Sequence, residues 1–232
     1  MGDISVIARR LKDGHVQHGW SGNGGYFSMV GNRLLKWYTE PQMVEYLFSL
    51  GQLGLIGAPN SEYGGYSFMY THGLTGKPHY LGTSEDDMFS KIALTDYGYL
   101  YDMDNRWYYI VPHRFYVKIP LEIIEENLDE RGNEFEFIKK IHKQILEYIL
   151  REYIEEDITF REFMEEKGYD NEKIWSQYEN KEYALYEFLD RYNDIYNYFD
   201  EWIIVLVNEE THEITGFKMK RKTENHIETI DW

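Results

Sequence analysis

Short apolar runs bounded by turn residues dominate the pattern of hydrophobic and polar positions in the first half of the chain. Asp-Gly is a strong hairpin signal between such runs, because glycine adopts a positive φ at little cost. Two pairs of runs predict β-hairpins: 4–11 with 15–20 around Asp13-Gly14, and 97–103 with 106–111 around Asp104-Asn105. Residues 114–119 alternate apolar and polar side chains and predict a further, half-buried strand.

Helical spacing also appears in this half. Phe27, Val30, Leu34 and Tyr38 recur at that spacing and predict a helix over 26–38, with Gly31 in its middle. A second short helix is predicted to begin at Pro41, a residue favoured at the first helical position, and to close at Gly51. The remaining predicted elements are strands at 66–70 and 79–81 and a short helix at 85–92.

The second half is predicted to be mostly helical. The apolar stripe from Phe137 to Ile149 predicts a helix over about 134–153. Thr159 and Glu162 have the spacing of a capping box, and Gly168 stands where a C-terminal cap belongs. The elements predicted after these are helices at 171–178 and 181–199, a hairpin of 202–207 with 214–220, and a short strand at 226–232.

These elements predict an α+β fold with a strand-rich N-terminal half, an acidic helical segment and a C-terminal β-hairpin with a short final strand. Composition also changes near Pro120, since 16 of the 19 glycines and all five prolines precede residue 121. We therefore predict two regions, 1–120 and 121–232. No flexible linker separates them, so packing as one body stays open. The helices are either an insertion between strand-rich segments or a terminal domain.

Charge is unevenly distributed between the two regions. Residues 1–120 hold 11 acidic and 10 basic side chains, whereas the whole chain has a net charge of -17. Residues 144–217 alone hold 20 acids and 6 bases. Phosphate binding needs clustered Lys and Arg, so the acidic half is not expected to bind DNA or RNA directly.

The absence of cysteine excludes disulfides, thiolate metal sites and cysteine nucleophiles. His15 and His18, three apart on a predicted strand, point to opposite faces and do not chelate one ion. We expect no metal and no cofactor. The N-terminal residues lack the pattern of a secretory signal, and the longest apolar run, 203–207, is too short to span a membrane, which predicts a cytoplasmic protein without membrane contact.

The acidic helical segment supplies the candidate binding residues. A solvated, solubilising surface explains such acidity in many proteins, whereas a folded acidic face can also act as a decoy for a basic, nucleic-acid-binding surface. The predicted partner-binding residues are the carboxylates that cluster around the capped helix and continue along the next one: Glu155, Glu156, Asp157, Glu162, Glu165, Glu166, Asp170, Asp190 and Asp194.

Three segments carry a resemblance to a group of proteins. Residues 16–27, 64–68 and 107–120 resemble uncharacterised proteins carried by phages and mobile elements of Gram-positive bacteria. The resemblance covers the first half only and contains no known catalytic motif. It implies a role in interaction with the host, and small acidic proteins of such elements include inhibitors of restriction and CRISPR systems, some of which mimic DNA.

Three classes of function remain open. The leading hypothesis is a non-enzymatic protein-binding module that inhibits a basic, nucleic-acid-binding host protein through its acidic surface. The alternative is an enzyme acting on a small substrate near the glycine-rich loop 21–25, with Ser21, Asn23, His18 and His79 as candidate residues. That loop lacks the lysine of a phosphate-binding loop and the spacing of a dinucleotide site. The third class is a structural or regulatory protein, and exposed hairpin edges would allow a homodimer.

Overall fold

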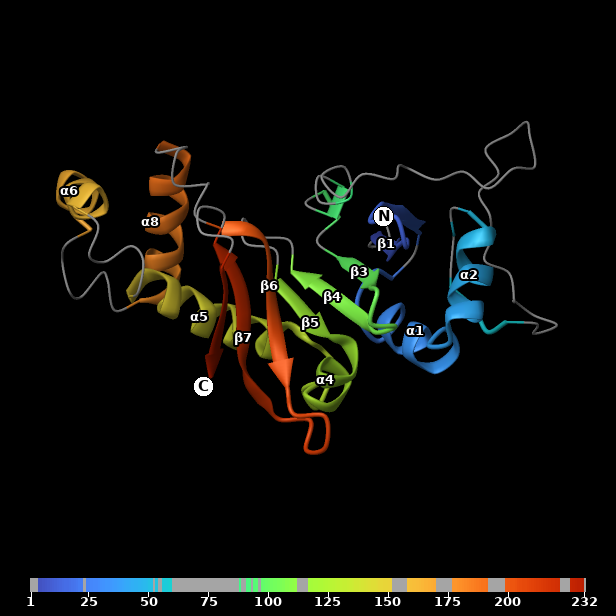
Figure 1. Ribbon diagram of the computed structural model, residues 1–232. Helices are drawn as coiled ribbons and strands as arrows, with labels where there is room; N and C mark the ends of the chain where they lie inside the picture. Colours follow the sequence, from blue (N-terminus) through green and yellow to red (C-terminus); the bar gives the residue numbers. More distant parts are fainter. Residues whose placement is uncertain are drawn as a thin grey trace.

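The fold is α+β and is built on one mixed β-sheet (Figure 1). The computed structural model describes most of the chain, and the statements below concern that part. The described residues are 4–22, 24–51, 53, 56–59, 88, 91, 92, 94, 95, 97–111, 117–151, 158–169, 177–191, 199–221 and 226–231.

Eight strands form the sheet in the order β2-β1-β3-β4-β5-β6-β7-β8. Neighbouring strands are antiparallel except for two parallel pairs, β1 with β3 and β5 with β6. The strands are β1 (Ser5–Arg10), β2 (Val16–Ser21), β3 (Gly98–Tyr101), β4 (Trp107–Val111), β5 (Val117–Pro120), β6 (Phe199–Val207), β7 (Ile214–Arg221) and β8 (His226–Asp231). The β5–β6 pair joins strands from the two compositional regions, so one sheet runs through both.

Helices occupy the two crossovers that the parallel pairs require. The helices before β3 are α1 (Gly31–Trp37) and α2 (Pro41–Ser49), and those between β5 and β6 are α4 (Leu121–Glu126), α5 (Phe135–Ile149), α6 (Ile158–Lys167) and α8 (Tyr178–Arg191). The acidic helices therefore lie between two strand-rich segments. Figure 1 shows α5 running across β5, β6 and β7, and Tyr148 of α5 contacts Phe217 of β7 with ring centroids 5.2 Å apart.

Local signals explain the hairpins. Gly14 takes a φ of 87°, and the carboxylate of Asp13 accepts the His15 N–H at 3.0 Å, which closes the first turn. Asn105 takes a φ of 62° in the second turn. The three hairpins expected from the sequence, β1–β2, β3–β4 and β6–β7, are confirmed.

Both faces of the central sheet are buried. One face carries Ile7, Tyr99 and Tyr109 and packs against α1, α2, α4 and α5. The other carries a smaller cluster that includes Leu100 and Ile110. The prediction of a half-buried strand at 114–119 is therefore wrong for the described part of β5, where all four residues are buried. Alternation indicated a strand correctly but not its exposure, because Lys118 is covered like its apolar neighbours.

Several predicted boundaries differ from the structure. Helix α1 begins at Gly31 and not at 26. A Cβ atom added at Gly31 would come within 2.4 Å of the Phe27 ring, so the two pack closely. Thr159 lies inside α6, so the predicted capping box is wrong, whereas Gly168 takes the expected left-handed φ of 69°. The predicted helix 181–199 ends too late, because Phe199 is the first residue of β6. The predictions for 66–70 and 79–81 and most of those for 171–178 and 85–92 lie outside the described residues, and residues 88, 91 and 92 of the last range are helical as predicted.

Candidate functional site

Three of the predicted binding carboxylates lie on α6 with described side chains. Glu162, Glu165 and Glu166 are all exposed. Glu155, Glu156, Asp157, Asp170 and Asp194 lie outside the described residues, and Asp190 belongs to α8. The structure therefore brings together part of the predicted acidic surface, on one helix.

The opposite side of α6 fixes the helix in place. Phe160 and Phe163 are buried, and both contact Phe188 of α8, with ring centroids 4.8 Å and 5.4 Å away. At the C-terminal end, the Tyr169 N–H donates to the carbonyl of Met164 at 2.8 Å, and the Gly168 N–H donates to that of Glu165 at 3.1 Å. This pair of bonds is a Schellman cap, which satisfies the last carbonyls of the helix. The exposed carboxylates thus stand on a firmly packed helix.

Bases neutralise some of the acids on these two helices. Arg191 of α8 bonds Glu166 at 2.9 Å, and this hydrogen bond lowers the pKa of Glu166. Lys167 bonds Glu187 at 2.6 Å and lowers the pKa of Glu187 in the same way. The ion pairs connect α6 to α8, so part of the local charge serves to join the helices.

The outward stripe of α6 remains uncompensated. Glu162 and Glu165 form no ion pair with the described residues. Ile158 lies one turn before Glu162 on the same stripe and is 68% exposed. On α8, Tyr183 is 61% exposed. We call Ile158, Glu162 and Glu165 the outward stripe: an exposed apolar side chain followed by two carboxylates.

The residues of the enzyme hypothesis do not converge in the described structure. Ser21 and His18 both lie on β2 and are buried, 1% and 0% exposed. They are three residues apart on one strand, so their side chains point to opposite faces of the sheet. His18 contacts the Val16 carbonyl through a ring nitrogen at 3.3 Å. Asn23 and His79 lie outside the described residues.

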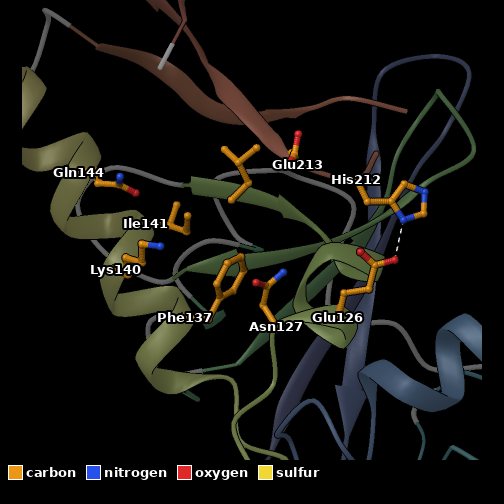
Figure 2. Close-up of a pocket in the computed structure, with 9 residues that line it drawn as sticks. Glu126, Asn127, Phe137, Lys140, Ile141, Gln144, His212 and Glu213 are labelled. Carbon is orange, nitrogen blue, oxygen red and sulfur yellow. Dashed lines mark hydrogen bonds and ion pairs between the residues drawn. The ribbon is translucent and has the colours of Figure 1, made fainter. Parts of the chain in front are cut away.

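A pocket that sequence patterns did not indicate lies between α5, the end of α4 and the β6–β7 turn (Figure 2). At its rim His212 and Glu126 pair at 2.5 Å through Nδ1 of the ring. The hydrogen bond that the ring donates to Glu126 raises the pKa of His212, which favours the protonated ring. His212 has a φ of 56°, a conformation that histidine tolerates better than most residues. The pocket combines residues from 126–144 with residues 212–214, which are far apart in sequence, so no local spacing could indicate it.

A buried charge cluster lies where the central strands end. Asp102, just after β3, accepts hydrogen bonds from Arg10 at 2.9 Å and from Lys118 of β5. Burial alone would raise the pKa of Asp102, but Lys118 and Arg10 hold it below its ordinary value. Nearby, Arg106 pairs with both Glu122 of α4 and Glu209 of the β6–β7 turn. The two ion pairs of Arg106 join the two compositional regions.

Comparison with protein-family models, with curated proteins and with solved structures finds no match to this chain. Within the described residues, no three His, Asp or Glu side chains gather closely enough to hold a metal ion. No helix in that part of the chain has both the length and the apolarity needed to cross a membrane.

Proposed function

We propose that the chain is a protein-binding module that engages a basic surface of a partner protein through the outward stripe of α6. The observation that carries the proposal is the stripe itself. Ile158, Glu162 and Glu165 are exposed on the side of α6 that faces away from the buried Phe160 and Phe163.

Two physical arguments support a basic partner. Glu162 and Glu165 lie on neighbouring turns of one helix, and like charges at this spacing destabilise it slightly. Lysine or arginine side chains of a partner would relieve that repulsion and would speed association through long-range attraction. Ile158 supplies apolar contact area beside the carboxylates, and large exposed apolar groups are typical anchors of interfaces.

The finer proposal is inhibition of a nucleic-acid-binding host defence protein. It rests on the acidity of the helical segment and on the resemblance to proteins of mobile elements. The pairing of Glu166 and Glu187 with bases limits how many charges are left to mimic a run of phosphates. We therefore favour recognition of a compact basic patch over imitation of a long DNA segment.

The test is affinity capture from a lysate of the source organism, with mass spectrometry and nucleic-acid detection, at low and moderate salt. Glu162→Gln with Glu165→Gln should abolish capture of a basic protein. The matched control is Glu125→Gln with Glu130→Gln, which removes two exposed carboxylates elsewhere and changes the net charge equally. The control should retain the partner. Equal loss in both variants, or capture that is unaffected by salt, would refute a specific role for the stripe.

Self-association is read from the same preparation. Light scattering of the purified chain reports whether it forms the homodimer that exposed sheet edges would allow. A stable dimer that captures no partner would favour the structural or regulatory class of function.

A further inference from the structure

The pocket beside the β6–β7 turn has an apolar floor. Its volume is about 520 Å³, within the range of ligand pockets, and it is open to solvent. Phe137 and Ile141 of α5 and Ile214 at the start of β7 form the floor, and Figure 2 shows Phe137 and Ile141 on the side of α5 that faces the turn.

The polar part of the lining includes several hydrogen-bond acceptors. The Asn127 side chain donates its amide N–H to the Ile123 carbonyl at 2.9 Å, which leaves its amide oxygen for a ligand. Oε1 of Gln144 is buried and has no hydrogen-bond partner among the described residues. Glu126 and Glu213 also line the pocket; the Glu126 carboxylate pairs with His212, and that of Glu213 accepts a hydrogen bond from the Thr211 hydroxyl at 3.2 Å. A ligand that fits this lining therefore carries several donors and a positive charge.

We infer that the pocket receives the guanidinium group of an arginine side chain from a basic partner protein. A guanidinium is planar, carries five N–H donors and no acceptor, and stacks on aromatic faces such as that of Phe137. Glu213 and the amide oxygen of Asn127 are its expected partners, and the aliphatic stem would pack on Ile141 and Ile214. The inference rests on the proposed function in one respect only, which is that a partner protein supplies the arginine.

The lining disfavours an anion. Its cations are Lys140 and His212, and Glu126 already holds His212. A carboxylate or phosphate ligand would approach Lys140 while facing Glu213 and the amide oxygen of Asn127. Lys140 is exposed and has no ion pair with the described residues, so its four-carbon stem can swing away from an entering cation. Replacing Lys140 should therefore strengthen the binding of a cation and weaken the binding of an anion.

The test is an NMR titration of the full chain with Nα-acetyl-arginine N-methylamide. The capped lysine analogue, free L-arginine and inorganic phosphate are the comparison probes. We expect the arginine probe to shift side-chain amide signals of Asn127 and Gln144 at lower concentration than the other three. Glu213→Gln should weaken its binding by about two- to fivefold, and Lys140→Gln should strengthen it by a similar factor, as for exposed ion pairs. Glu210→Gln, on the same turn but outside the lining, should change nothing.

Three results would overturn the inference: no shift of the pocket amides at millimolar arginine probe, tighter binding of phosphate, or weaker binding of the arginine probe after Lys140→Gln. If free L-arginine bound more tightly than the capped form, the inference that the arginine belongs to a protein would be overturned. The titration needs no partner, so it is independent of the capture experiment. If the probe fails while Glu162→Gln with Glu165→Gln still abolishes capture, the pocket assignment falls and the proposed function stands.

Discussion

Replacement of Asp102 by asparagine tests the buried charge cluster most directly. The Asp102 side chain is 12% exposed and that of Lys118 is 6% exposed, so both charges are largely removed from water. Asp102→Asn keeps the shape of the side chain but removes the charge that faces Lys118 and Arg10. Removing one partner of a buried ion pair costs about 3–5 kcal/mol, because the other charge stays in a poorly solvated place.

The partial exposure of Asp102 and Arg10 favours the lower end of that range, about 3 kcal/mol. For a chain of this size, that loss corresponds to a fall of about 6–12 °C in the melting temperature. The effect depends on pH. The folded-state pKa of Asp102 is lowered, so its contribution to stability is complete above its unfolded pKa, near the ordinary 3.8, and is lost as pH falls through the folded value. The difference between wild type and Asp102→Asn should therefore shrink in acid.

The assay is urea unfolding followed by tryptophan fluorescence, at neutral pH and at pH values below 4. The exposed Glu125→Gln serves as a control for the loss of one negative charge. A second measurement introduces Asp102→Asn into a Lys118→Met background, where its cost should fall because the stranded ammonium is gone. A loss below about 1 kcal/mol at neutral pH, or an equal loss in both backgrounds, would refute the reasoning.

Three further substitutions each test one structural feature. Phe188→Ala should cost about 3–5 kcal/mol in urea unfolding, because it empties the buried site between α6 and α8, and a loss typical of a surface residue would contradict that packing. Gly168→Ala should lower the free energy of unfolding by about 1–2 kcal/mol, because a φ of 69° strains any L side chain. Nothing lies near the added methyl group, so no clash contributes. An unchanged urea midpoint would contradict the cap. The pKa of His212 is raised, so its pairing with Glu126 stabilises the fold fully below pH 6.5 and this stabilisation is lost as pH rises through the folded pKa. His212→Gln should therefore abolish that decline in a pH series of melting temperatures. A decline that persists in the variant would contradict the pairing.

Local chemistry made the hairpins predictable from sequence. Asp13-Gly14 and Asp104-Asn105 place residues that tolerate positive φ between two strands, and the turn alone fixes the pairing. Gly168 is predictable for the same reason. The start of α1 was not, because the ring of Phe27, four residues earlier, packs closely against Gly31, and the apolar spacing does not show this packing.

Long-range pairing was beyond sequence patterns. Nothing in residues 117–120 or 199–207 indicates that β5 and β6 lie side by side in parallel, so the sequence predicted the C-terminal hairpin but not its place in a common sheet. Charge counts found the acidic surface on α6, yet they could not show that Arg191 and Lys167 neutralise Glu166 and Glu187. Those pairings need α8 beside α6, which only the fold supplies.

The parallel β5–β6 pair also has a consequence for how the chain folds. Hairpins such as β3–β4 close short loops and form within microseconds, whereas Val117 meets Ile203 only after the whole helical segment between them has been looped out. Such distant contacts slow folding. The sheet should therefore assemble as two preformed halves that meet late, and the seam between β5 and β6 would be the step at which refolding is most exposed to aggregation.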